Sequence, residues 1–189
     1  MKPYNDHREL LLAGSGGQGL ILAAVLLAEA AILEDKRVVQ TQSYGIATRG
    51  GLSTAELIID SREILFQQIE CPDVVLALTD EALKRYAIWA KRGVPIYYDT
   101  TLTELRPDPP CFGYPFTKVA GELGNERSVN LLAIGLLAAR TGVVHIESLK
   151  AAIRNRWGKR SAANERMVEA GADLAPDPPM DITPCSSNF

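Results

Sequence analysis

Glycines at three fixed positions mark the stretch of the chain best suited to hold a ligand. Gly14, Gly16 and Gly19 fit the spacing G-x-G-x-x-G, with Gly17 and Gln18 between the last two. In a nucleotide-binding turn these glycines allow a tight turn, close approach of the backbone to a phosphate, and close packing of helix on strand. Free backbone N–H groups at the start of the following helix also attract an anion. The stretch therefore predicts a turn suited to phosphate.

One residue of a dinucleotide site is missing. Such a site has an acidic residue about 20 residues further on, at the end of the second strand, where it holds the ribose. The second strand is predicted over 37–42 and ends in Gln40-Thr41-Gln42, while Glu34 and Asp35 precede it. The turn thus indicates a Rossmann-like fold more strongly than NAD binding. An alternative stays open, in which the glycines serve only packing or a protein contact.

A second candidate cluster follows the second predicted strand. This glycine-rich loop contains Ser43, Tyr44, Arg49, Gly50 and Gly51. An arginine beside two glycines can present its guanidinium to a phosphate or carboxylate while the backbone bends freely around it. The alternatives are an exposed turn arginine and an arginine that bridges to a neighbouring subunit.

Few other residues are candidates for acid–base or covalent chemistry. His7 and His145 stand in contexts where histidine is more often structural than catalytic. Cys111 has no basic partner in the sequence and is expected to be a packed thiol. Asn130, at the start of an apolar helix, either hydrogen-bonds within the fold or faces the site. The three cysteines form no C-x-x-C pair, so this chain alone is expected to hold no iron–sulfur cluster or zinc ion.

Alternating strands and helices must position these residues. Hydrophobic runs and periodicity predict strands over 9–13, 37–42, 53–59, 73–78 and 94–98, with a short edge strand within 112–116. They predict helices over 20–32, 80–92, 117–123, 128–140, 147–157 and 161–170, with Gly171 closing the last one. The pattern is that of an α/β fold with a Rossmann-like, mostly parallel sheet flanked by helices, and additional C-terminal helices. Because ligands of such sheets bind beyond the carboxyl ends of the strands, we expect the glycine turn, the loop 43–51 and the strand end at 78–80 to converge.

Composition sets the domain organisation and excludes some partners. The 189 residues are 47% hydrophobic, which suits one domain, predicted over 8–171. Residues 172–189 hold four of the eleven prolines and few apolar residues, so a disordered or draped tail is expected. The net charge of −3 implies no general attraction to nucleic acid or to a membrane. The sparse cysteines and the polar N-terminus, without a signal peptide, predict a cytoplasmic protein.

Three motifs together resemble the gamma subunit of 2-oxoacid:ferredoxin oxidoreductases. They are the GSGGQG turn of Gly14–Gly19, the run from QSYG to RGG over 42–51, and the NLLAIG segment of Asn130–Gly135; segments 164–166 and 169–171 also fit. The similarity covers roughly residues 8–171. The form of the second motif is closer to the 2-oxoglutarate and branched-chain members than to the indolepyruvate members. One departure is Ile46-Ala47-Thr48, where many members carry an acidic residue.

The resemblance implies a subunit that is not catalytic by itself. Such enzymes decarboxylate a 2-oxoacid oxidatively, form an acyl-CoA and pass electrons through iron–sulfur clusters to ferredoxin. Thiamine diphosphate sits between the alpha and beta subunits, and the clusters lie in the beta and often a delta subunit. The gamma domain helps assemble the complex and enclose coenzyme A. Carried over to this chain, Gly16–Gly19 and Arg49–Gly51 are expected at the edge that meets ligand and subunits.

Specific expectations and two competing hypotheses follow. The substrate is expected to be 2-oxoglutarate, and the isolated chain to be inactive, to hold no cofactor of its own, and to form a monomer or a homodimer. The first competitor is a free-standing Rossmann-fold nucleotide-binding oxidoreductase, which the missing ribose acid disfavours. The second is an assembly scaffold that binds no ligand.

Overall fold

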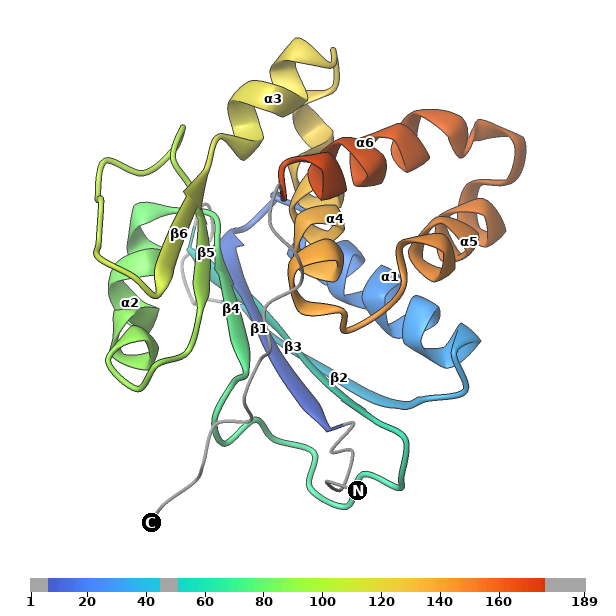
Figure 1. Ribbon diagram of the computed structural model, residues 1–189, viewed down its shortest axis with the longest axis horizontal. Coiled ribbons are helices and arrows are strands. Elements are labelled where there is room, and N and C mark those ends of the chain that lie inside the picture. Colours follow the sequence, from blue (N-terminus) through green and yellow to red (C-terminus); the bar gives the residue numbers. More distant parts are fainter. Residues whose placement is uncertain (1–6, 45–50, 176–189) are drawn as a thin grey trace.

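Six strands form one mixed sheet in the order β2-β3-β1-β4-β5-β6 (Figure 1). The computed structural model describes residues 7–44 and 51–175, so Arg49, Gly50 and the tail from residue 176 lie outside the described part. The strands are β1 (Arg8–Ser15), β2 (Arg37–Tyr44), β3 (Leu52–Asp60), β4 (Val74–Ala77), β5 (Ile96–Asp99) and β6 (Cys111–Tyr114). Each predicted strand is present, with bounds shifted by up to two residues at most ends.

The sheet is mostly parallel, as predicted, and β3 is the strand that runs against its neighbours. Strands β1, β4, β5 and β6 pair in parallel, whereas β3 is antiparallel to both β1 and β2. The cause is the length of the connection from Tyr44 to Leu52. Its seven intervening residues suffice for a hairpin, but a parallel crossover needs a dozen or more.

Helices cover the sheet on both faces. They are α1 (Leu20–Leu33), α2 (Asp80–Ala90), α3 (Phe116–Glu122), α4 (Val129–Thr141), α5 (Ile146–Trp157) and α6 (Ala162–Asp173), with single 3₁₀ turns at Glu126–Ser128 and Gly158–Arg160. Thr79 caps the start of helix α2, because its hydroxyl accepts a hydrogen bond from the Ala82 N–H. Helix α4 ends at Gly142, which has a φ of 62°.

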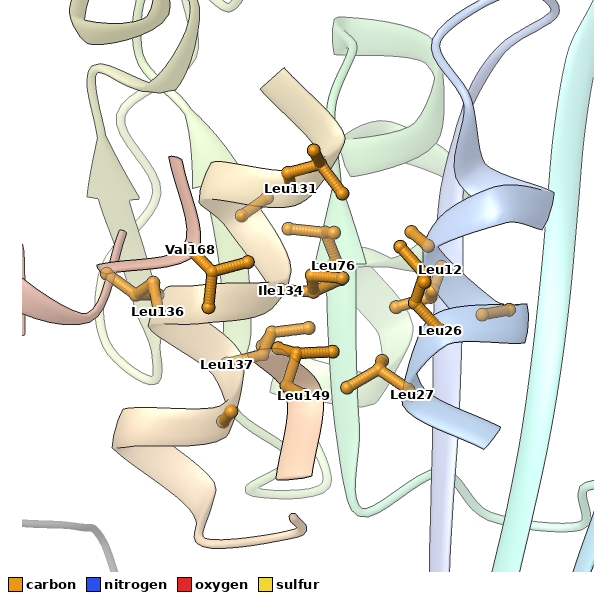
Figure 2. Close-up of a cluster of buried hydrophobic side chains, with 14 of the residues drawn as sticks. Leu12, Leu26, Leu27, Leu76, Leu131, Ile134, Leu136, Leu137, Leu149 and Val168 are labelled. Atoms are coloured by element: carbon orange, nitrogen blue, oxygen red, sulfur yellow. The ribbon is translucent and has the colours of Figure 1, made fainter. Parts of the chain in front are cut away.

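Alternation along the central strands divides the core between the two faces. In β1, Leu10 and Leu12 contribute to the larger core, which lies against α1, α4, α5 and α6. Their neighbour Leu11 points to the other face and packs with Leu83 of α2. Figure 2 shows the larger core, with Leu12 and Leu76 of the sheet facing side chains of α1 and α4. Packing in this larger core positions α1 and α4. The N-termini of both helices lie at the candidate site.

The C-terminal helix corrects one prediction. Helix α6 continues through Gly171 to Asp173, so Gly171 is an interior residue and does not cap the helix. Glycine is needed at this buried position because α6 crosses α4 so closely here that a side chain would meet the α4 backbone.

Two cysteines lie in the described part of the chain. Cys111 is a free, buried thiol. Cys71 is disulfide-bonded. The odd and sparse cysteine count gave no sign of this bond. Among the described residues, no helix has the length and hydropathy to cross a membrane.

Candidate functional site

The glycine turn lies where β1 ends and α1 begins, as predicted. Gly16 and Gly17 are exposed to solvent. Gly17 and Gly19 have φ angles of 95° and 72°, in the left-handed region that side chains rarely adopt. A Cβ added to Gly16 would meet no atom within 4 Å. The turn therefore combines a backbone conformation that needs glycine with an open corner at Gly16.

Gln18 holds the turn against the sheet. Its Oε1 accepts a hydrogen bond from the Ser15 N–H at 2.7 Å, and its Nε2 donates to the Leu78 carbonyl at 3.4 Å. The same Oε1 fills the space that a Cβ of Gly14 would need. Both ends of the Gln18 amide are thus used within the protein, linking the end of β1 to the end of β4.

Asn130 fixes the other side of the turn. Its side chain is only 3% exposed, and its Nδ2 donates to the Gly19 carbonyl at 3.0 Å. A Cβ at Gly19 would lie 2.7 Å from that nitrogen, so glycine is required there for space as well as for φ. Of the two roles left open for Asn130, the hydrogen bond within the fold is present, at the glycine turn, and a contact with a ligand stays a prediction.

The β2–β3 hairpin reaches the same edge of the sheet. The backbone N–H of Gly16 donates to the Gly51 carbonyl at 3.2 Å. Ser43 and Tyr44 end β2 here, because Tyr44 pairs with Ser53 and Ser15 pairs with Leu52. The turn, the described ends of the loop and the end of β4 converge as predicted, while residues 45–50 of the loop lie outside the described part. Whether these residues bind a ligand stays a prediction.

The arrangement offers backbone donors and little acid–base chemistry. Helix α1 begins at Gly19, which has no side chain to cap the N–H groups of the first turn. Those groups carry partial positive charge and favour an anion. The nearby amides of Gln18 and Asn130 are occupied in holding the turn. Anion binding at this edge is therefore favoured by the backbone of the first turn of α1, and stays a prediction.

A carboxylate cluster at the opposite edge was missed by the sequence analysis. His7 contacts Asp60 through Nδ1 at 3.0 Å and Glu9 through Nε2 at 3.2 Å. Glu9 also accepts from the backbone N–H groups of Glu70 and Cys71. Together these bonds anchor the connector between β3 and β4. The structural interpretation of His7 is thus confirmed, and the signal in the sequence was an acidic residue opening an otherwise apolar strand.

The remaining candidates also have structural roles. Burial, and then the nearby charge of Asp108, raise the pKa of the Cys111 thiol, so it is a packed, unreactive side chain as predicted. His145 is exposed at the start of α5, and its backbone N–H donates to Glu34. Within residues 7–44 and 51–175, no group of three or more His, Cys, Asp or Glu could hold a metal ion.

Comparison with known proteins defines the class. Residues 9–174 match the model of the pyruvate ferredoxin/flavodoxin oxidoreductase family. The chain is 40% identical over 164 residues to the 2-oxoglutarate synthase subunit KorC of Archaeoglobus fulgidus, covering 86% of this chain and 85% of that protein. It is 34% identical to the common gamma subunit of pyruvate/ketoisovalerate oxidoreductases of Thermococcus litoralis, covering 84% and 93%.

Solved structures agree with these matches. The gamma subunit of a keto/oxoacid ferredoxin oxidoreductase from Geobacter sulfurreducens has a TM-score of 0.77 and 34% identity, over 89% of this chain and 98% of that one. The chain belongs to the pyruvate ferredoxin/flavodoxin oxidoreductase family. Within it, the chain is a gamma subunit of a 2-oxoacid:ferredoxin oxidoreductase, similar to KorC, and is part of a multi-subunit complex.

Proposed function

We propose that this gamma subunit helps to enclose coenzyme A in the assembled oxidoreductase, with the glycine turn against one of its phosphates. The observation that carries the proposal is the open, exposed corner at Gly16, beside the uncapped first turn of α1. A phosphate at this corner would accept hydrogen bonds from backbone N–H groups and would be stabilised by the helix dipole. Ser43, Tyr44 and Gly51 border the corner. Arg49 of the same hairpin is predicted to add a guanidinium, with Gly50 as a flexible neighbour.

The wider reaction is assigned to partner subunits. Thiamine diphosphate is expected between the alpha and beta subunits, and iron–sulfur clusters in the beta and delta subunits, with ferredoxin as electron acceptor. This division is supported by the chemistry of the gamma edge, where the side-chain amides of Gln18 and Asn130 serve to position the turn. The isolated chain is accordingly expected to be inactive, and its location to be the cytoplasm.

The expected 2-oxoacid is 2-oxoglutarate. Support comes from the identity of 36–40% to KorC subunits of 2-oxoglutarate synthases in four archaea. A 2-oxoglutarate:ferredoxin oxidoreductase of Magnetococcus marinus, solved with 2-oxoglutarate, coenzyme A and succinyl-CoA, shares the fold at a TM-score of 0.80. Its identity of 24% carries only the fold to this chain, which spans 33% of that one.

A pair of glycine variants tests the coenzyme A proposal in the co-purified complex. Gly16→Val fills the open corner and should raise KM for coenzyme A about tenfold or more, with the 2-oxoacid KM and the melting temperature little changed. The matched variant Gly14→Ala places a methyl group where Gln18 Oε1 lies. It should lower the melting temperature instead.

The competing hypotheses predict different results. If the Gly16→Val complex keeps the wild-type KM for coenzyme A and the wild-type heat of coenzyme A binding in calorimetry, the hypothesis of an assembly scaffold that binds no ligand is favoured. Turnover of a 2-oxoacid by the purified chain alone would favour a free-standing oxidoreductase.

A further inference from the structure

The disulfide at Cys71 lies at the edge of the sheet opposite to the candidate site. Cys71 directly precedes β4, is 7% exposed, and donates its backbone N–H to the Glu9 carboxylate at 3.0 Å. The sequence has three cysteines, of which Cys71 is disulfide-bonded and Cys111 is free. Within one chain, this count points to Cys185 as the partner. Such a bond requires the C-terminal segment to reach the amino ends of the parallel strands.

The end of α6 sets the distance that this segment has to cross. Gly171 of α6 packs against Leu132 near the start of α4, and α4 starts at the glycine turn. Ala175 follows and packs against the larger core. Ten peptide units join Ala175 to Cys185, and they reach about 31 Å in an extended polyproline conformation. Strand β1, with eight residues, is about 26 Å long. Only a nearly direct path along the sheet therefore connects the two ends.

A surface of aromatic side chains and one arginine lies on the helix-rich face of β5 and β6, at the margin of the sheet away from α1 and α5 (Figure 1). The rings of Tyr97 and Phe112 stack with centroids 5.6 Å apart, and those of Tyr97 and Tyr114 are 6.2 Å apart. Arg140, in the last turn of α4, is 5% exposed and donates a hydrogen bond to the Tyr97 hydroxyl. These four residues are called the aromatic–arginine surface below.

We propose that residues 176–185 run back along α4 across the aromatic–arginine surface and are joined to the β3–β4 connector by a disulfide between Cys71 and Cys185. This segment contains four prolines, the two acidic residues Asp177 and Asp181, and no basic residue. Proline-rich segments dock on aromatic surfaces in an extended conformation that costs little entropy to order. A buried guanidinium is stabilised by an anion beside it, and a carboxylate of this segment supplies that anion at Arg140.

The covalent step is a thiol–disulfide exchange with a small disulfide oxidant such as glutathione disulfide. The thiols of Cys71 and Cys185 give up two electrons and two protons, and the oxidant takes them up as it is reduced to two thiols. An undocked short tail would give the two cysteines an effective concentration on the order of millimolar. Docking on the aromatic–arginine surface raises that concentration, because the tail is already directed towards Cys71.

Peptide mass spectrometry of the full-length chain tests the connectivity. The chain is oxidised with glutathione disulfide, alkylated under denaturing conditions, and digested without reductant. A peptide pair joined through Cys71 and Cys185 is expected, with Cys111 alkylated. A bond from Cys71 to Cys111, a bond between two chains, or alkylation of both Cys71 and Cys185 overturns the proposal.

Equilibration with a glutathione redox buffer tests the docked path. The double variant Asp177→Asn with Asp181→Asn should lower the effective concentration of the two thiols at least about tenfold, because Arg140 loses its anion. The matched control is Asp173→Asn, which removes a carboxylate from the exposed end of α6 and should keep the wild-type value.

The tail variant leaves the core unchanged, and the melting temperature of its reduced form, compared with reduced wild type, checks that it is folded. An effective concentration equal to that of wild type in the folded tail variant overturns the docked path. The Gly16→Val variant should form the bond as readily as wild type, which separates this proposal from coenzyme A binding.

Discussion

Gly135 of α4 and Gly171 of α6 mark two places where the backbones of these crossing helices approach closely. A Cβ at Gly135 would lie 2.9 Å from the carbonyl carbon of Val168 in α6, and closer still to the carbonyl oxygen of Val168. A Cβ at Gly171 would lie 2.7 Å from the carbonyl carbon of Leu132 in α4. Each glycine therefore makes room for the backbone of the opposite helix, which brings α6 onto the outer side of α4.

Replacing Gly171 with alanine is expected to destabilise the subunit. The added methyl group has no space unless the two helices separate, and overpacking of this kind costs about 2 kcal/mol. Chemical denaturation of the purified chain measures the change in the free energy of unfolding. The control is Arg166→Ala, at an exposed site on the same helix, where a change within about 0.5 kcal/mol is expected. Equal stability of Gly171→Ala and wild type would show that the helices separate without cost.

Asn130→Asp is expected to weaken both the fold and the proposed coenzyme A site. Aspartate presents oxygen where Asn130 donates to the Gly19 carbonyl, so a buried charge would face an acceptor. The loss should be about 2 kcal/mol of unfolding free energy, with a raised KM for coenzyme A in the complex. Asn155→Asp, exposed on α5, makes the same chemical change and should alter neither quantity. A stable Asn130→Asp protein would contradict the anchoring role of this side chain.

Ionisation of Asp60 is expected to contribute to the pH dependence of the free energy of unfolding. Burial tends to raise the pKa of Asp60, but hydrogen bonds from the Arg62 backbone and from His7, and the charge of Arg62, lower it further than burial raises it. A carboxyl with a lowered pKa in the folded state stabilises the protein above its unfolded pKa of about 3.9. That contribution disappears as the pH falls through the lower folded value.

The measurement is the unfolding free energy from about pH 2 to pH 7, compared between wild type and Asp60→Asn. The wild-type curve should fall more steeply in the acid range than that of the variant. Asp108→Asn, at an exposed loop position, should keep the wild-type slope. Parallel curves for wild type and Asp60→Asn would refute the assigned pKa direction.

Local patterns predicted most of the elements. The apolar run after Gly19 predicted a helix over 20–32, and α1 spans Leu20–Leu33. Such runs report burial and periodicity, which depend on near neighbours in the chain. The direction of β3 does not follow from its own alternation, because both orientations bury the same residues. The short 45–51 connection was the signal that it must return antiparallel.

Long-range packing explains the features that the sequence did not reveal. Gly171 was taken for a helix cap because glycine commonly ends helices, yet its reason for being glycine is the backbone at Leu132. Likewise, Gln18 was a candidate ligand contact in the turn. Its hydrogen bond to Ser15 is local, whereas its bond to Leu78 follows only from the pairing of β1 with β4. The position of the candidate site was predictable from the glycine spacing, whereas the sequence left two roles open for Asn130 and did not indicate the bond from Gln18 to Leu78.

The antiparallel course of β3 has a mechanical consequence for the enzyme. Leu52 continues directly from Gly51, whose carbonyl is tied to the N–H of Gly16 by one hydrogen bond. A neighbouring protein that contacts the end of the hairpin would therefore act on the glycine turn through that bond and through the pairing of Leu52 with Ser15. If the coenzyme A proposal holds, docking of another subunit at the hairpin acts directly on the proposed site.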